Sequence, residues 1–367
     1  MDLLTIGQII NTTLVFATAL IFASLGGIFS EKSGVTNLGL EGFMVFGAFA
    51  AGIGAHYAQE AGMGGTTSAW MGVLLAIVLG VLVSLIHAVA SITFKADQII
   101  SGIVINFLAA GSTLYLVKLL FEGSGDSPLV QGFSKFDVPL LKDIPLLGEA
   151  FFKNVYPTTY LAILFVFLTY YIMFKTPFGL RLRSVGEHPS AADTVGVKVL
   201  RYRYIGVMIS GALAAIGGAA ITLTTTGTFS HNTVSGQGYI AIAAMIFGKW
   251  NPIGAFGAAV FFGFSQAIRN YVQLFEWSQS IPQEIIFMLP YLLTIIVLVA
   301  AVGRSSAPSA LGEAYDPGKG KLAICQFTIQ KLDKRVRLVR AFFCFLECCQ
   351  ATFSRYFGSR ADTHIFR

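Results

Sequence analysis

The first 318 residues contain no cysteine and few charged residues. All four cysteines of the 367 residues lie in the tail, at Cys325, Cys344, Cys348 and Cys349. A body without thiols excludes a disulfide framework, thiol catalysis and a cysteine-ligated metal there. Charged residues make up 12% of the chain and hydrophobic residues 55%, whereas soluble domains carry about 25% charged residues. The composition therefore indicates an integral membrane protein.

Motifs of metal and phosphate chemistry are also missing. The five histidines are scattered without metal-ligand spacing, and the sequence has neither His-Glu-x-x-His nor a Gly-x-x-x-x-Gly-Lys-Ser/Thr phosphate loop. Buried acid and base pairs of the kind that proton-driven pumps use are sparse. We therefore expect this chain to have no catalytic residue, no metal site, no bound cofactor and no nucleic-acid partner.

Long apolar stretches dominate the first 304 residues, and strands of the porin type are absent. A transmembrane helix needs about 20 apolar residues. The first stretch has no positive leader, because the first basic residue is Lys32, so we expect it to remain as a membrane helix. The sequence predicts an all-α, polytopic helical bundle with about 8–10 spans. The apolar stretches cover residues 6–29, 39–58, 69–93, 99–120, 157–174, 203–224, 238–248, 252–271 and 284–303.

The stretch at 238–248 is too short to cross a membrane alone. Glycines surround it, which predicts a broken helix whose backbone lines a cavity or is covered by protein. A weak internal repeat involves the same region. Ser33-Gly34 followed by Met44-Val-Phe-Gly47 recurs as Ser235-Gly236 followed by Met245-Ile-Phe-Gly248. Two repeated halves and chance similarity between membrane sequences both explain this likeness.

The placement of basic residues predicts the orientation of the bundle. Six Lys and Arg residues lie within 175–203, whereas the turn at 59–68 has none. Because positive loops stay inside, we expect 175–203 in the cytoplasm. Counting crossings from there, with 238–248 as one of them, predicts an external N-terminus, an external loop at 121–156 and an internal C-terminus.

Polar side chains at the starts of two apolar stretches are candidates for a translocation path. Asn37 and Glu41 are four residues apart and could share a helix face. Glu41 is either functional, as acids at membrane depth often are, or an anion favoured near a helix N-terminus. Gln98, Ser101 and Asn106 suit a neutral polar solute or hydrogen bonds between helices.

A third group of polar residues follows the sixth stretch. Residues 222–232 are rich in hydroxyl groups, and Ser235 and Gln237 come just after them. On the predicted orientation this group faces outside, beside the broken helix. It is either the external mouth of a path, with Gln237 in it, or a flexible loop.

The segment 175–198 is a long, polar, basic island between two apolar spans. It carries Gly, Pro and Ala-Ala at intervals, which indicates a small folded element that docks a cytoplasmic partner. The segment resembles the cytoplasmic coupling loop of permease subunits of ABC importers. The superfamily in question includes branched-chain amino acid, ribose and nucleoside permeases. Supporting runs occur in order at 33–42, 96–102, 176–187, 236–254 and 289–294, and Asn37-Leu-Gly-Leu-Glu-Gly42 and Phe247-Gly-Lys-Trp-Asn-Pro252 are most similar to the nucleoside branch.

The resemblance implies a division of labour. An extracytoplasmic solute-binding lipoprotein delivers a small polar solute, and two permease subunits, the second expected to be a different one, form the pore. Cytoplasmic ABC ATPases hold the ATP and Mg and supply the energy. The resemblance places the contact with the ATPase on Gly179, Arg183, Gly186, Glu187, Ala191, Ala192 and Gly196.

The implied protein is a transport subunit and not an enzyme, multi-pass in a bacterial cell membrane, that moves nucleosides or related sugar-like solutes inward. One alternative is a permease for ribose-like sugars or branched-chain amino acids. Another is a secondary transporter or channel that works alone. An intramembrane enzyme is disfavoured, because the catalytic groups that it needs are missing.

The tail differs from the rest of the chain. Residues 1–318 hold 15 Lys/Arg and 16 Asp/Glu, whereas residues 319–367 hold 10 and 3. We expect a permease domain at 1–304 with its coupling loop at 175–201, a cytoplasmic end at 305–318, and an atypical tail at 319–367. The tail is either an extension foreign to the family, such as a frameshift product, or a basic segment that lies on anionic lipid.

Overall fold

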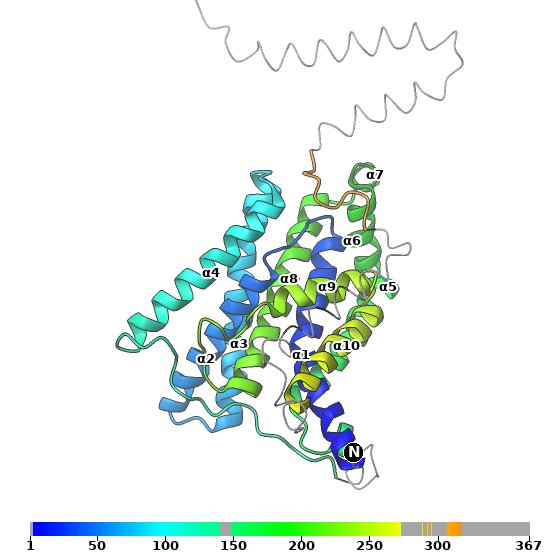
Figure 1. Ribbon diagram of the computed structural model, residues 1–367. Coiled ribbons are helices and arrows are strands. Elements are labelled where there is room, and N and C mark those ends of the chain that lie inside the picture. The colour runs from blue at the N-terminus through cyan, green and yellow to red at the C-terminus, as the bar shows by residue number, and fades with distance from the viewer. Residues whose placement is uncertain are drawn as a thin grey trace, which may run out of the picture. The chain divides into compact units, whose positions relative to one another are not determined.

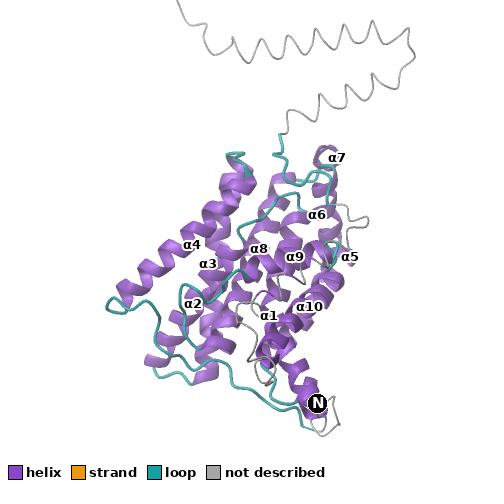
Figure 2. Ribbon diagram, viewed as in Figure 1, coloured by secondary structure: helices purple, strands orange, loops and turns teal. Residues whose placement is uncertain are grey.

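The computed structural model describes residues 3–139, 148–272, 288, 292, 295 and 307–316. Helices and connecting loops account for these residues, and the extended pairings among them are two isolated bridges (Figure 2). One compact unit ends at Tyr315 and a second begins at Asp316. The predicted all-α bundle is therefore confirmed.

The helices within the described ranges are labelled in chain order in Figure 1. Three π-helical turns extend or separate them, η1 (Val89–Thr93), η2 (Gly148–Phe152) and η3 (Thr222–Thr226). The α-helices are α1 (Leu3–Lys32), α2 (Leu40–Glu60), α3 (Gly65–Ala88), α4 (Gln98–Leu120), α5 (Pro157–Lys175), α6 (Pro177–Glu187), α7 (Pro189–Thr194), α8 (Val199–Ile221), α9 (Gln237–Phe247) and α10 (Pro252–Val272).

Five of the described helices are long and apolar enough to cross a membrane, namely α1, α3 with η1, α4, α5, and α8 with η3. The helices α2 and α10 have 21 residues each. The 11 residues of α9 span about 16 Å, well short of the ~30 Å hydrocarbon core, as predicted for a broken helix. The stretch at 284–303 lies almost wholly outside the described residues.

The central helices are α1 and α8. The α1 helix packs against α5, α8, α9 and α10, and α8 also packs against α2 and α3. Glycines allow this close contact. A Cβ atom on Gly47 of α2 would lie 2.3 Å from the carbonyl oxygen of Ala215 on α8. Close backbone approach is how helices associate in lipid, so these glycines set the spacing of the core.

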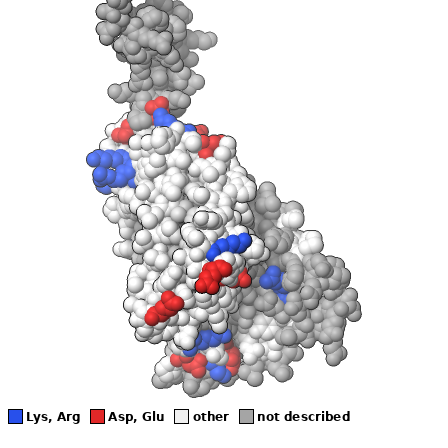
Figure 3. Space-filling view, turned by 90° about the vertical axis from the view of Figure 1, so that its left-hand side faces the viewer, with Lys and Arg blue, Asp and Glu red and all other residues white. Residues whose placement is uncertain are grey.

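Apolar side chains cover the outward surface of α3 and α4. Most of the described surface drawn in Figure 3, on the side where α4 lies, carries no charged residue. Leu74, Val78 and Leu82 of α3 and Val104 and Phe107 of α4 are more than half exposed. A face of this kind is stable against lipid tails and would promote aggregation in water. The fold therefore agrees with the composition.

The N-terminus and the α6–α7 segment lie at opposite ends of the bundle (Figure 1). An external N-terminus and a cytoplasmic coupling loop require this arrangement, because α1 runs between the two ends. The assignment of one end to the cytoplasm stays a prediction.

Candidate functional site: a helix junction, a polar cavity and the coupling segment

A break between α1 and α2 lies next to the start of α9. Gly34 in this break and Gly236 just before α9 have φ angles of 89° and 83°. Glycine adopts this left-handed backbone without the steric penalty that other residues incur. The two copies of the weak repeat therefore share a glycine turn that precedes a helix.

Glu41 of α2 caps α9 with its carboxylate. Its Oε1 accepts a hydrogen bond from the amide of Gly236 at 2.7 Å, and its Oε2 accepts one from Gly238 at 2.6 Å. A Cβ on Gly238 would lie 2.5 Å from the Cα of Glu41, so only glycine permits this approach. The charge satisfies free amides at the positive end of the α9 dipole. The sequence indicated an anion near a helix N-terminus, and Glu41 does lie in the first turn of α2. The amides that it binds, however, belong to the start of α9.

The prediction that Asn37 and Glu41 share a helix face is wrong, because α2 begins only at Leu40. The Asn37 Nδ2 donates to Ser210 Oγ on α8 at 2.9 Å, and its Oδ1 accepts from the Gly39 amide at 3.1 Å. Asn37 therefore ties the break to α8.

Two side-chain amides of α4 bind the backbone of the same break and of the first turn of α2. Gln98 Oε1 accepts from the Thr36 amide at 2.7 Å. Asn106 Oδ1 accepts from the Gly42 amide at 2.8 Å, and its Nδ2 donates to the Leu38 carbonyl at 2.9 Å. Buried backbone groups need such partners, and a chain break in the bundle leaves several without an intrahelical one.

Ser101, the remaining polar candidate on α4, pairs with His87 Nδ1 of α3 at 2.9 Å. For this helix the structure thus favours the alternative of hydrogen bonds between helices. The structure places five predicted path residues at one junction, namely Asn37, Glu41, Gln98, Ser101 and Asn106. None of these five lines the cavity described below.

The other end of α9 is held from the opposite side of the break, by a contact that the sequence analysis missed. Trp250 Nε1 donates to Glu31 Oε2 of α1 at 2.5 Å, and both residues are buried. Trp250 and Lys249 adopt positive φ angles, a conformation that needs support from its surroundings. The acid and the indole are 219 residues apart, so no local pattern signals their pairing.

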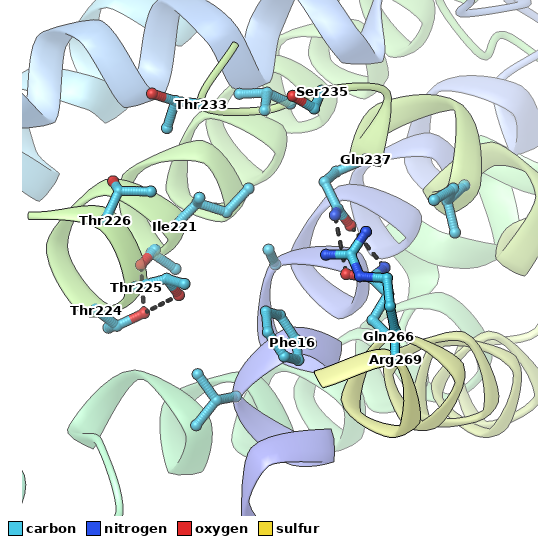
Figure 4. A pocket seen from close by; sticks show the side chains of 15 residues that line it. Phe16, Ile221, Thr224, Thr225, Thr226, Thr233, Ser235, Gln237, Gln266 and Arg269 are labelled. Atoms are coloured by element: carbon cyan, nitrogen blue, oxygen red, sulfur yellow. Dashed lines mark hydrogen bonds between the residues drawn. The ribbon is translucent and has the colours of Figure 1, made fainter. Parts of the chain in front are cut away.

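A cavity of about 320 Å³ lies among α1, α8, η3, α9 and α10 (Figure 4). This volume is at the lower end of the ~300–1,000 Å³ range of small-molecule sites. Figure 4 shows Thr224, Thr225 and Thr226 on one side, Gln237 and Gln266 opposite, and Phe16 of α1 between them. Part of the hydroxyl-rich run at 222–232 therefore lines a cavity. The interpretation of this run as the mouth of a path requires such a cavity.

Gln237 and Gln266 form a reciprocal amide pair across the α9–α10 interface. Each Nε2 donates to the other Oε1 at 3.0 Å. Gln237 is the one predicted path residue in this lining, and Arg269 is the one charged side chain among the described lining residues. Hydroxyls, amides and an aromatic ring suit a neutral, polar, planar solute, since the ring offers a stacking surface and the amides both donate and accept.

The coupling segment comprises α6 and α7. Thr176 caps α6 by accepting a hydrogen bond from the Gly179 amide at 3.3 Å. Cβ atoms on Gly179 and Gly186 would lie 2.2 Å from the Ile172 carbonyl oxygen and 2.3 Å from that of Lys32. These two glycines therefore pack α6 against α5 and α1. Replacing Gly179 would disturb this packing as well as any partner contact.

The remaining coupling residues divide between the surface and the interior. The Arg183 guanidinium lies over the Phe174 ring, 4.7 Å from its centre, a favourable cation–π arrangement. Ala192 is buried with a small apolar cluster, whereas Ala191 is exposed. The predicted contact residues on the surface are Glu187, Ala191 and Gly196.

Comparison with known proteins supports the resemblance noted above. A family model described as branched-chain amino acid transport system / permease component matches residues 9–298. The guanosine ABC transporter permease protein NupQ of Bacillus subtilis is 49% identical over 321 residues, which cover 87% of this chain and 100% of that protein. The nucleoside ABC transporter permease protein NupC of Lactococcus lactis is 41% identical over 86% of this chain and 98% of its own length.

A more distant relative is named for a different substrate. The putative glucose ABC transporter permease protein TsgC13 of Haloferax volcanii is 32% identical over 84% of this chain and 97% of its own length. These full-length matches and the helical bundle agree on a multi-pass transport subunit of the bacterial plasma membrane. The chain belongs to the branched-chain amino acid transport system / permease component family.

Proposed function

We propose that this chain is the permease subunit of an ABC importer that carries nucleosides into the cell. The observation that carries the proposal is the cavity, where Phe16 lies between a threonine wall and the Gln237–Gln266 pair. A nucleoside offers a planar base to the ring, a polar base edge to the amides and sugar hydroxyls to the threonines. The two relatives named for guanosine and nucleosides, matched over nearly their whole length, support the same solute class.

The residues around the α1–α2 break do not line the cavity, but they hold the helix that does. Glu41 and Glu31 hold the two ends of α9, and α9 carries Gln237 into the cavity. Movement of the break would therefore move one wall of the cavity. Alternating access needs such a wall, since a permease must bind its solute from one side and release it to the other.

The energy comes from partners in this proposal. A cytoplasmic ABC ATPase, which holds the ATP and Mg, docks on the exposed surface of α6 and α7. A second, different permease completes the pore, and an extracytoplasmic lipoprotein delivers the solute. Family membership supports these partners in general terms.

Uptake by intact cells tests the function. Cells with and without the gene receive labelled guanosine, adenosine or uridine, with and without a protonophore while ATP is maintained. We expect gene-dependent uptake that survives the protonophore. Abolition by the protonophore would point to a secondary transporter. Gene dependence for labelled ribose or leucine alone would move the solute to one of the alternative classes.

Substitution of Gln237 tests the cavity. We expect Gln237→Ala to raise the KM for uptake about threefold to tenfold, because it removes a hydrogen-bonding group and leaves Gln266 without its partner. Gln59→Ala is the matched control, since Gln59 binds Ser68 and the Gln131 carbonyl outside the cavity. Equal KM values for both variants, at equal membrane levels, would remove Gln237 from the solute site.

A further inference from the structure

Residues 308–315, here called the C-terminal strap, bind both the coupling segment and the α1–α2 break. Ser309 Oγ lies 2.9 Å from both the carbonyl oxygen and the carboxylate Oε2 of Glu187, so its single proton is shared between these two acceptors. The Ala310 amide donates to the Gly186 carbonyl at 3.0 Å, and the Gly312 amide donates to the Gly34 carbonyl at 3.3 Å. The strap therefore joins the end of α6 to the turn that precedes α2.

A buried arginine of α8 lies between the strap and the break. Arg203 is only 1% exposed, and its Nη1 donates to the Glu313 carbonyl at 2.7 Å. Its Nη2 would lie 3.0 Å from a Cβ atom on Gly34, so the guanidinium contacts both segments. A desolvated cation is costly unless its surroundings hold it. Among the described residues the Arg203 Nε and Nη2 atoms have no hydrogen-bond partner, so the Glu313 carbonyl of the strap is the acceptor that stabilises this charge.

The end of the strap is anchored by burial. Tyr315 is 7% exposed and packs with Val185 of α6, Ala192 of α7 and Val199 of α8. The strap thus contacts every helix of the coupling segment. A movement of α6 and α7 must either carry the strap along or break these contacts.

The charge on Glu187 strengthens the contact with Ser309. Burial opposes ionisation of this carboxyl, but hydrogen bonds from Ser309 and the nearby Lys32 and His188 outweigh it and lower the pKa of Glu187. A group whose pKa is lowered by folding contributes its stabilisation above its ordinary pKa and loses it as the pH falls. The contact therefore persists at neutral pH.

We infer that the C-terminal strap transmits movement of the coupling segment to the α1–α2 break and, through the break, to α9. The contacts are continuous, from Glu187 through Ser309 and Gly312 to Gly34, and from the break through Glu31 and Glu41 to both ends of α9. The inference rests on the proposed docking of an ATPase at α6 and α7. Ser309 and Arg203 are then positioning residues for transport, and neither touches the solute.

Two truncations form a matched test. A chain that ends at Asp316 loses residues 317–367, and with them all four cysteines, but keeps the strap. We expect uptake within twofold of the full chain. A chain that ends at Ala307 also loses the strap, and we expect at least tenfold lower uptake with the same amount of co-purified ATPase and no stimulation of ATP hydrolysis by receptor and solute. Equal uptake by the two chains would overturn the inference.

A reversible disulfide between the strap and α6 tests the same contact if truncation lowers the amount of protein in the membrane. In the cysteine-free chain that ends at Asp316, Glu187→Cys combined with Ser309→Cys replaces the hydrogen bonds by a disulfide. We expect uptake to be low under reducing conditions and to recover at least fivefold on oxidation of the same membranes, whereas each single variant does not respond. A defect in folding would not be reversed in assembled protein, so equal uptake in both states would overturn the inference.

A cross-linking experiment tests the proposed docking of the ATPase separately from the role of the strap. Ala191→Cys in the same cysteine-free chain should cross-link to the ATPase, because Ala191 is on the surface of α7. No cross-link, with uptake still dependent on the strap, would reject docking at this surface. A cross-link, with uptake independent of the strap, would reject the strap as the transmitting element.

Discussion

Replacing Glu41 by glutamine should lower solute uptake at least about tenfold while the protein still reaches the membrane. Each carboxylate oxygen accepts one amide of α9, and hydrogen bonds to charged groups contribute about 1.5–3 kcal/mol each. Glutamine keeps the size but supplies one acceptor, and its NH₂ group faces the second amide donor. Loss of one such bond is worth about a factor of ten or more in an equilibrium, so α9 should no longer follow the break.

Asp97→Asn is the matched control for Glu41→Gln. Asp97 also caps a helix, accepting from the amides of Ile99 and Ile100 on α4 at 2.8 and 3.0 Å, but it is exposed. Asparagine is as good an N-cap as aspartate, so uptake should change less than twofold. If Glu41→Gln were equally mild at equal membrane levels, the cap on α9 would not matter for transport.

Gly218→Ala should prevent stable packing of α2 against α8. A Cβ atom at this position would lie 1.9 Å from the carbonyl oxygen of Met44, far inside van der Waals contact. The helices α2 and α8 would have to separate, and overpacking of this kind costs about 1–3 kcal/mol or more. We expect severalfold less protein in the membrane and a lower midpoint of thermal aggregation in detergent, measured on the same tagged protein.

Gly257→Ala on α10 provides the comparison, because within the part of the chain that the structure describes no atom beyond its own helical turn lies within 4 Å of the Cβ position. Alanine there should be neutral or stabilise the helix by up to about 1 kcal/mol. Equal membrane levels of the Gly218 and Gly257 variants would show that α2 and α8 can separate without loss of the fold.

Features that depend on short runs of sequence were predictable. Aspartate is a preferred helix-capping residue, and Asp97, just before the apolar stretch at 99–120, caps α4 through the amides of Ile99 and Ile100. The short helix at α9 followed from glycines that flank an apolar run too brief to cross. The cap of α4 and the shortness of α9 both depend on residues a few positions apart. At that range the distance along the chain determines the distance between the residues in the fold.

The polar candidates show where such reasoning stops. The spacing of Asn37 and Glu41 predicts one helix face, but α2 begins only at Leu40. The Asn37 side chain binds α8, and the Glu41 side chain binds the start of α9. A polar residue in an apolar span needs a partner in either case, whether that partner is a solute or another helix. Only the packing of the helices shows which of the two is present.

The sequence by itself determined that this is a helical membrane permease, because hydrophobic length, scarce charge and ordered family runs are properties of the chain and not of its packing. The tertiary structure alone decided that Gln237 and Gln266 meet at one cavity, that Glu31 and Glu41 hold the two ends of α9, and that the strap joins α6 to the break. The last of these contacts links residues more than a hundred positions apart. In a bundle such pairs are set by which helix faces approach closely enough to exclude lipid, and here glycines without side chains allow that approach.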